Sequence, residues 1–445
     1  MLEYIFNRIL NSLSDEMVHK IMTEPYDNNL LEGLTVTKRL GIESIIEAGI
    51  RAQTGLEINR PLGSPINHSH WDLIYLNSTQ LFQLPTMDSI AIDTGVTIGT
   101  RAKKPLKLSI PIMITGMSYG GSLSLNTKTA LARGATMAGT STNTGESAVS
   151  DEERKAASFL IGQYNRGHFM TDEDLRKLDA IEVQLGQGAY GGATPSAKKA
   201  AEIDQHLRKT WRLKAGQDAV WSSRLKGVNS PQDVINLLNG LKEEYEVPIG
   251  IKIAANHFIE KELEVIIQSE ADYIVIDGAE GGTAVASAFL QDNVGLPTIY
   301  GLSRTIRFLE KKGVRDKYQV IAAGGMKNPG VFMKAYALGA DAVYIGTIAL
   351  IALAQSQIEK TLPFSTPPQL FIHNGKMVEQ LDIEKGAEHL ANFLNSCIND
   401  MKLAVIGLGK TAFNQLDRND LVSVDKELAR VLGIGYAGEP KKTDS

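Results

Sequence analysis

The chain has 445 residues, of which 43% are hydrophobic and 22% are charged, and its formal net charge is -5. This length holds one large barrel with flanking segments, or several ordinary domains. Mild acidity without a cluster of Lys and Arg argues against nucleic acid as the main partner. The single cysteine, Cys397, excludes a disulfide framework, a CxxC zinc site and a cysteine-ligated iron–sulfur cluster within the chain.

Neither a targeting segment nor a membrane span is expected. Met1–Leu13 carries Glu3, Asn7 and Arg8 among its apolar residues, unlike a signal peptide. The longest apolar run, around Ala342–Ala354, is interrupted by a glycine and a threonine and is too short to cross a bilayer. We therefore expect a cytoplasmic protein with no membrane partner.

The first part of the chain is predicted to be an N-terminal extension, residues 1–105, that packs on a larger domain. Apolar residues recur at helical spacing up to about residue 60. Residues 61–110 then show short strand-like alternation, and we expect them to cover one end of the larger domain. No metal site is predicted, because three histidines are expected to make structural hydrogen bonds: His68, His70 and His168.

Short apolar runs alternate with helical patterns over residues 106–355, which predicts a (β/α)8 TIM barrel. A long polar stretch at 190–231 is predicted to be a loop insertion that covers a site. Residues 356–445 are predicted to form a C-terminal helical segment. The expected strands are Ile110–Thr115, a run that ends in the polar cluster Ser141–Glu146, Ser158–Asn165, Ala180–Leu185, Pro248–Ile253, Ala271–Ile276, Gln319–Ala323 and Ala342–Ile345.

Glycine clusters follow the last expected strands. The stretch Asp277–Thr283 contains Gly278, Gly281 and Gly282, and later strands run into Gly324–Gly325 and Gly346–Thr347. A strand that ends in glycine lets a ligand approach bare backbone. The last two clusters have the form of the phosphate site that such barrels build after strands seven and eight. These residues therefore predict the ligand-binding face of the barrel.

Lys252 lies inside the strand that ends at Ile253. Burial of an ammonium costs several kcal/mol unless the group is paired, so this lysine is either a structural ion pair or is aimed at an anionic cofactor, and we favour the cofactor. A phosphate site beside Lys252 fits flavin mononucleotide (FMN) better than a nicotinamide, for which no strand–GxGxxG–helix unit is present. A closed barrel would present these polar side chains to one cavity: Thr115, Ser118, Asn143, Glu146, Gln184, Lys252 and Asp277.

Four motifs together carry a family resemblance: Met117–Gly120, Ser141–Glu146, Gln187–Ala189 and Asp277–Thr283. They resemble the motifs of the FMN-binding synthase domain of glutamate synthase, and most closely those of its stand-alone relatives, from about residue 60 to about residue 435. The resemblance implies a β/α barrel that holds FMN and passes electrons to an imine formed from 2-oxoglutarate and ammonia. It predicts an FMN-dependent oxidoreductase of amino-acid metabolism that acts on an amino or imino acid.

Carried over by position, the resemblance implies roles for individual residues. The catalytic residues are predicted to be Glu146, Lys252 and Tyr190. The predicted substrate-binding residues are Glu146, Gln187 and Lys198, and Arg224 is added to them because the same long loop could carry its charge to the site. The predicted FMN-binding residues are Met117, Ser118, Asn143, Gln184, Lys252, Asp277, Gly281, Gly282, Thr283, Gly324, Gly325, Gly346 and Thr347.

The sequence departs from the family pattern in two ways. Gln184 and Tyr190 stand where the family has lysines that would hold substrate carboxylates, so 2-oxoglutarate is not fixed as the substrate. No cysteine cluster follows the last strand and no glutaminase domain is present. FMN must then be reduced directly by a substrate or by a separate reductase, and an amine-donor subunit is a further expected partner. A homo-oligomer is also expected.

Several alternatives stay open at this point. Glu146 could be a solvated loop carboxylate, and Asp277 could cap its loop through backbone amides. The barrel could instead oxidise a 2-hydroxy acid or catalyse an isomerisation, chemistry for which we would expect a His–Arg pair or a dedicated anion site. It could also be a degenerate, non-catalytic FMN-binding subunit.

Overall fold

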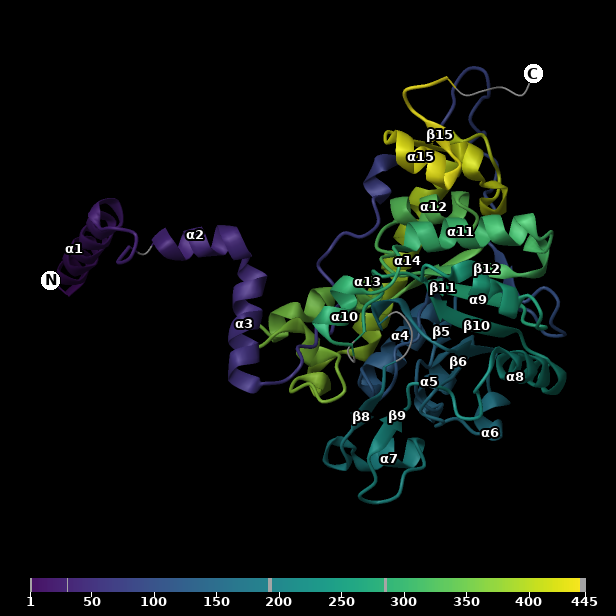
Figure 1. Ribbon diagram of the computed structural model, residues 1–445, viewed down its shortest axis with the longest axis horizontal. Coiled ribbons are helices and arrows are strands. Elements are labelled where there is room, and N and C mark those ends of the chain that lie inside the picture. Colours follow the sequence, from purple (N-terminus) through teal and green to yellow (C-terminus); the bar gives the residue numbers. More distant parts are fainter. Residues whose placement is uncertain (1, 30, 191–193, 284–285, 441–445) are drawn as a thin grey trace. The chain divides into compact units, whose positions relative to one another are not determined.

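The computed structural model describes residues 2–29, 31–190, 194–283 and 286–440. The chain divides into two compact units, Met1–Ile58 and Asn59–Ser445. The first unit consists of helices α1 (Leu2–Thr23), α2 (Leu31–Leu40) and α3 (Ile42–Thr54), coloured purple in Figure 1. Neither α2 nor α3 has a buried residue. No helix in the described part of the chain combines the length and apolarity that a membrane crossing needs.

The second unit is built on a parallel eight-stranded sheet in the order β4-β13-β12-β11-β10-β7-β6-β5. The sheet closes on itself, because the amide of Ile114 at the end of β4 donates a 3.0 Å hydrogen bond to the carbonyl of Ser141 just before β5. This closure confirms the predicted (β/α)8 barrel. Its strands are β4 (Ile112–Ile114), β5 (Thr142–Asn143), β6 (Leu160–Tyr164), β7 (Ala180–Gln184), β10 (Ile249–Ala254), β11 (Tyr273–Asp277), β12 (Gln319–Ala323) and β13 (Ala342–Ile345).

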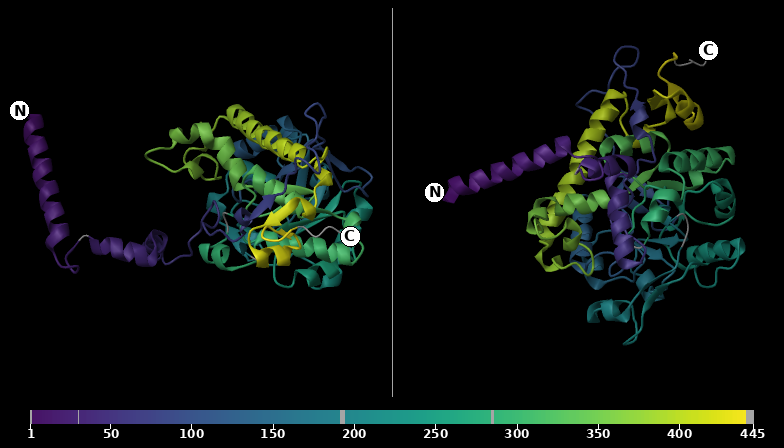
Figure 2. Two further views of the ribbon diagram at one scale, coloured as in Figure 1. Left: turned by 90° about the horizontal axis from the view of Figure 1, so that it is seen from above. Right: turned by 60° about the vertical axis from the view of Figure 1, so that its left-hand side comes forward.

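Helices surround this sheet (Figures 1 and 2). The residues of β10 to β13 are buried throughout, as apolar runs that face the barrel interior on one side and helices on the other must be. Ser124 caps the helix that begins at Leu125, because its side chain accepts a hydrogen bond from the amide of Thr127. The helices are α4 (Leu125–Met137), α5 (Asp151–Ala156), α6 (Asp172–Leu175), α8 (Pro231–Glu244), α9 (Ile259–Ile266), α10 (Ala288–Asn293), α11 (Thr298–Lys311), α12 (Pro329–Ala337) and α13 (Thr347–Ala354).

A hairpin covers the amino-terminal end of the barrel. The strands β2 (Val96–Ile98) and β3 (Leu106–Leu108) pair in antiparallel fashion. Ile98, Leu106 and Leu108 pack in one buried cluster with side chains from the barrel interior. This hairpin therefore contributes to the core at the amino-terminal end of the barrel.

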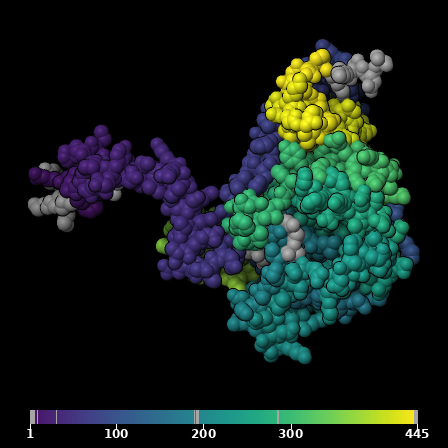
Figure 3. Space-filling view, in the orientation of Figure 1, coloured from purple at the N-terminus to yellow at the C-terminus, as the bar shows by residue number. Residues whose placement is uncertain are grey.

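The predicted loop insertion at 190–231 has secondary structure of its own. It contains the antiparallel pair β8 (Ser196–Lys198) and β9 (Ala219–Trp221) with α7 (Gln205–Thr210) between them. Three aromatic rings anchor it, because Trp211 stacks on Phe169 at 4.6 Å and meets Trp221 edge to face. Figure 3 shows this teal hairpin projecting from the unit. Residues 191–193 of the insertion lie outside the described residues.

The C-terminal segment packs on the barrel in the same unit. The long helix α14 (Ile383–Gly407) lies against α4 and α13. A small sheet that the sequence did not predict joins β14 (Leu421–Ser423) to β1 (Ile74–Leu76) and β15 (Gly435–Tyr436). The remaining helix is α15 (Lys426–Leu432), and short 3-10 helices are η1 (Trp71–Leu73), η2 (Gly188–Tyr190), η3 (Ala200–Glu202), η4 (Arg315–Lys317), η5 (Gln355–Lys360), η6 (Pro367–Leu370), η7 (Val378–Gln380), η8 (Phe413–Gln415) and η9 (Arg418–Asp420).

Candidate functional site

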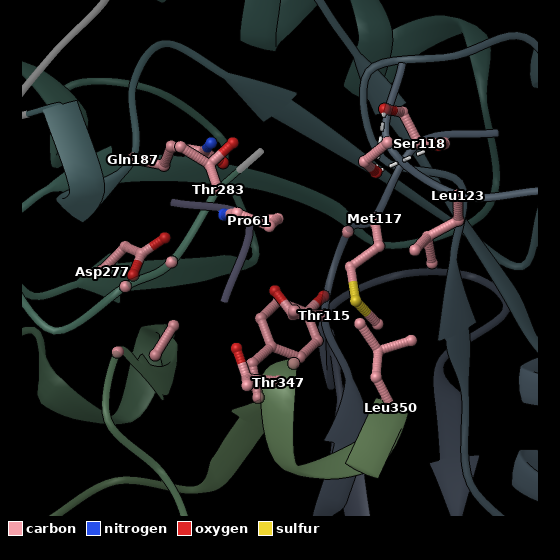
Figure 4. A pocket seen from close by; sticks show the side chains of 18 of the residues that line it. Pro61, Thr115, Met117, Ser118, Leu123, Gln187, Asp277, Thr283, Thr347 and Leu350 are labelled. Atoms are coloured by element: carbon pink, nitrogen blue, oxygen red, sulfur yellow. Dashed lines mark hydrogen bonds between the residues drawn. The ribbon is translucent and has the colours of Figure 1, made fainter. Parts of the chain in front are cut away.

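A cavity of about 270 Å³ opens at the carboxyl ends of the barrel strands. Figure 4 shows Met117, Leu123 and Leu350 grouped on one side of it, with Asp277 and Gln187 on the other. Ligand sites of β/α barrels lie at this end of the strands. These predicted residues line the cavity: Met117, Ser118, Glu146, Gln187, Lys252, Asp277, Gly281, Gly282, Thr283, Gly324, Gly325, Gly346 and Thr347.

The loop after β12 requires glycine at two positions. Gly324 and Gly325 have φ angles of 96° and 69°, which L side chains rarely adopt. A Cβ at Gly324 would lie 2.7 Å from the Thr298 hydroxyl, and one at Gly325 would lie 2.9 Å from Cβ of Glu280. The tight turn thus brings bare backbone to the cavity wall.

This wall has the donors of an anion site. Within the described part of the chain, the amides of Gly324, Gly325 and Gly346 donate to no acceptor. The helix α13 begins at Thr347, so its amino-terminal N–H groups lie at the same place. Unpaired amides at a helix N-terminus favour a bound phosphate. The donor set therefore fits the phosphate of a nucleotide cofactor.

Lys252 forms a buried ion pair and also borders the cavity. Its ammonium lies 2.9 Å from the Asp277 carboxylate, and its side chain is only 2% exposed. The same side chain lines the cavity. Burial lowers the pKa of Lys252, but the carboxylates of Asp277 and Glu182 outweigh this effect and raise the pKa overall. A permanent cation therefore borders the cavity, and Asp277 pairs with it.

A buried polar network lies beneath the cavity and centres on Glu182, which sequence reasoning missed. The Glu182 carboxylate accepts hydrogen bonds from Gln163 Nε2 at 2.7 Å, the Tyr344 hydroxyl at 2.8 Å and Asn143 Nδ2 at 3.4 Å. Gln163 and Tyr344 line the cavity, whereas Asn143 is fully buried below it. A second buried charge, Lys128, donates to the Asn143 carbonyl at 2.6 Å. The cavity floor is therefore held by charge-assisted hydrogen bonds.

Glu146 is part of a buried ion pair and is not a solvated loop residue. Its carboxylate lies 3.1 Å from Arg166 and accepts a 3.3 Å hydrogen bond from the Tyr190 hydroxyl. Burial raises the pKa of Glu146, and Arg166, Tyr190 and Lys252 oppose that shift. Sequence reasoning missed Arg166, which follows β6. The polar side chains at the end of that strand were the available signal.

Five predicted site residues do not line this cavity, and the first of them is Asn143, which is buried below it. Gln184 is fully buried in β7, and Tyr190 is 3% exposed beside Arg166. Lys198 lies on β8, two residues beyond the cavity-lining Ser196. Arg224 lines a separate cavity between α8 and α9, so the structure does not bring it to the predicted site.

Two segments outside the barrel complete the cavity wall. Pro61 and Leu62 line one side, and the Leu62 carbonyl accepts a 3.2 Å hydrogen bond from the Thr347 hydroxyl. Phe371 and Ile372 of the C-terminal segment line another side. Neither contribution was predicted, because each segment reaches the site only through tertiary packing.

Comparison with known proteins assigns the family. The family model described as the conserved region in glutamate synthase matches residues 69–411. An archaeal-type glutamate synthase [NADPH] from Thermotoga sp. (strain RQ2) is 32% identical, over 93% of this chain and 86% of the relative. A glutamate synthase large subunit-like protein from Rhizobium meliloti (strain 1021) is 33% identical, over 87% of this chain and 92% of the relative.

Solved structures agree with the barrel fold at much lower identity. Flavocytochrome b2 with sulfite bound superposes with a TM-score of 0.51 at 15% identity, over 89% of this chain and 90% of that one. An active chimera of (S)-mandelate dehydrogenase gives a TM-score of 0.51 at 15% identity, over 84% of this chain and 94% of that one. The sequence relationships decide the family: this chain belongs to the glutamate synthase family and is a glutamate synthase-type oxidoreductase.

Proposed function

We propose that the cavity binds FMN, with its phosphate on the glycine turns and its ring system beside Lys252. The observation that carries the proposal is the convergence on one cavity of the unpaired amides at Gly324, Gly325 and Gly346 and the buried ammonium of Lys252. A dianionic phosphate needs the first feature, and an electron-rich ring is stabilised by the second. Solved neighbours named as flavocytochromes share the fold, which is consistent with this cofactor.

FMN supplies two-electron redox chemistry when it is bound. The protein's own part is to place charge and protons around the reacting centre. The Lys252 ammonium, fixed by Asp277, stabilises negative charge on the cavity side of β10. Glu146 is placed to exchange a proton with the substrate, because its raised pKa brings it closer to neutral pH. Tyr190 and Arg166 fix the orientation of the Glu146 carboxylate.

The substrate is proposed to be an amino acid or a 2-oxo acid with an amine. Glutamate synthase relatives are named for this chemistry, and some of their names include NADPH. Because this chain has neither a nicotinamide fingerprint nor cysteines for a cluster, electrons come from the substrate or from a separate reductase. We propose that a reductase or amine-donor subunit is the protein partner and that the chain acts in the cytoplasm.

The lining of the cavity favours this chemistry over oxidation of a 2-hydroxy acid. We expect the latter to use a His–Arg pair against the substrate. Among the described residues that line the cavity there is neither a histidine nor an arginine. The nearby Arg166 is occupied by Glu146. The likeness to enzymes such as mandelate dehydrogenase therefore remains one of fold.

An anaerobic reduction screen tests the proposal. The purified protein is expected to be yellow, with the absorbance bands of bound flavin. Mixing with amino acids, or with 2-oxo acids and an amine after chemical reduction, should change the flavin absorbance, whereas 2-hydroxy acids such as lactate and mandelate should not. A protein that takes up no flavin, or one reduced by lactate in preference to every amino acid, would contradict the proposed function.

A further inference from the structure

The charges around the cavity limit the substrates that it can hold. Two cations are present among its described lining residues, Lys252 and Lys327. Lys252 is paired with Asp277 at 2.9 Å. Lys327 follows the glycine turn Gly324–Gly325 by two residues and so lies at the proposed phosphate end. Neither lysine is therefore available to bind a substrate carboxylate near Glu146.

Arg166, the buried cation nearest to Glu146, is fully committed to protein groups. Its Nη1 donates 2.9 Å hydrogen bonds to the carbonyls of Thr194 and Ser222. Its Nε and Nη2 contact the Glu146 carboxylate, and Nη2 also donates to the Tyr190 hydroxyl at 3.0 Å. The side chain is 1% exposed. A substrate carboxylate could reach this guanidinium only by displacing a buried partner, which is costly.

Tyr190 closes this region from the other side. Its ring lies under the Arg166 guanidinium, 5.5 Å from the centroid, and its hydroxyl contacts both members of the Arg166–Glu146 pair. We call the part of the cavity lined by Glu146, Gln187 and Ser196 its inner half. This inner half presents a carboxylate already paired with Arg166, together with the uncharged side chains of Gln187 and Ser196. Such a wall can hydrogen-bond an uncharged group but offers no counter-ion to an anion.

Among the described residues, Lys198 is a cation that lies next to the cavity wall without lining the cavity itself. Lys198 and the cavity-lining Ser196 are on the same face of β8, because alternate residues of a strand point the same way and only Ala197 between them is exposed. The backbone of Lys198 pairs with Ala219, but within the described residues its ammonium makes no hydrogen bond or ion pair. Burial lowers its pKa, although the carboxylates of Glu202 and Asp204 oppose this shift. A half-buried ammonium without a bonded partner is ready to bind an anion.

His373 stands beside this lysine. It directly follows the cavity-lining Ile372, and its amide donates to the Ser122 carbonyl at 2.9 Å. Burial, and then the Lys198 ammonium, lower the His373 pKa to about 4, while Asp204 acts in the opposite direction. At neutral pH the imidazole is uncharged, and its Nε2 lies 3.4 Å from the Asp204 carboxylate. The rim therefore carries the Lys198 ammonium and a neutral imidazole, with the Asp204 carboxylate beside them.

We propose that the enzyme takes an amino or 2-oxo acid with a single carboxylate, held at the rim by Lys198, and with an uncharged side chain in the inner half of the cavity. This inference rests on the proposed function and narrows its substrate class. A second carboxylate, as in 2-oxoglutarate, would lie in the inner half without a counter-ion. Tyr190 is the residue that excludes it, because it occupies space beside Arg166 where a cation would be needed.

Calorimetric titration of the FMN-loaded protein tests this selectivity. We expect 2-oxobutyrate to bind at least about tenfold more tightly than 2-oxoglutarate. Lys198→Ala should weaken 2-oxobutyrate binding by about tenfold or more. The matched control is Lys199→Ala, which removes a neighbouring exposed lysine paired with Asp218 and should leave both affinities unchanged. Tyr190→Lys should raise the affinity for 2-oxoglutarate.

The flavin absorbance of each variant distinguishes failure of the proposed function from failure of this inference. A colourless wild-type protein would overturn the proposed function, and the inference with it. A flavin-loaded protein that binds 2-oxoglutarate as tightly as 2-oxobutyrate would overturn the inference alone, as would an unchanged affinity in Lys198→Ala. If Tyr190→Lys fails to retain flavin, two measurements still test the inference. These are the affinities of the wild-type protein for 2-oxobutyrate and 2-oxoglutarate, and the comparison of Lys198→Ala with Lys199→Ala.

Discussion

The buried ion pair between Lys252 and Asp277 allows a quantitative test of the cavity's electrostatics. Lys252→Met keeps a similar shape but leaves the Asp277 carboxylate, 7% exposed, without its partner at 2.9 Å. Removal of one member of a buried pair costs about 3–5 kcal/mol. Asp277→Asn should cost less, because the Glu182 carboxylate still acts on Lys252. The double variant removes both charges, so its loss of stability should fall at least about 1 kcal/mol short of the sum.

Guanidinium unfolding of the flavin-free proteins measures these free energies of unfolding, and flavin titration supplies a second observable. Lys252→Met should weaken FMN binding and lower the flavin's reduction potential, because the reduced, negatively charged ring loses its cation. The matched control is Lys242→Met, which breaks the 2.6 Å ion pair with Asp272 away from the cavity. It should destabilise the fold and leave flavin affinity unchanged. Additive losses within about 0.5 kcal/mol, or unchanged flavin affinity and potential in Lys252→Met, would refute the reasoning.

Three further predictions follow from individual contacts. Glu146→Gln should lower turnover about a hundredfold, with unchanged flavin content, because it removes a proton-exchanging group. Steady-state rates measure the turnover, and absorbance measures the flavin content. A turnover equal to that of the wild-type protein would mean that Glu146 has only a structural role. Gly325→Ala should weaken FMN binding, measured by fluorescence quenching, because its Cβ would lie 2.9 Å from Cβ of Glu280. The control Gly216→Ala, at a similar φ of 77° but in open space, should leave FMN binding unchanged. Equal effects of the two variants would contradict a phosphate site at the Gly324–Gly325 turn. His373 has its pKa lowered to about 4 in the folded protein, so the unfolded chain takes up its proton first as the pH falls below 6.5. Wild-type stability should therefore fall more than that of His373→Gln between pH 7 and pH 4.5 in urea unfolding, and parallel losses would argue against a buried neutral imidazole.

The features that sequence could predict are local ones. A short apolar strand followed by glycines specifies both its burial and its turn, so the barrel strands and the glycine turn at Gly324–Gly325 were predicted close to their observed positions. Lys252 stood out for a similar reason, because a charge inside an apolar run must find a partner. The same logic applied to Glu182, inside the buried strand Ala180–Gln184, would have predicted the network beneath the cavity.

The parts that were missed depend on contacts between distant segments. Phe371 and Ile372 reach the cavity because the C-terminal segment bridges to Leu123, which no periodicity reveals. The Arg166–Glu146 pair forms across two neighbouring strand ends. Arg224 was assigned to the site because it lies in the insertion, yet the chain turns after β9 and carries it to the outer wall.

Affinity for FMN compared with riboflavin tests the central claim most directly. The two ligands share the ring and the ribityl chain and differ in the phosphate, which the amides of Gly324, Gly325 and Gly346 are proposed to hold. Charge-assisted hydrogen bonds to a phosphate predict that FMN binds at least about a hundredfold more tightly than riboflavin in equilibrium titrations. Equal affinities for the two, or no binding of either, would contradict the account.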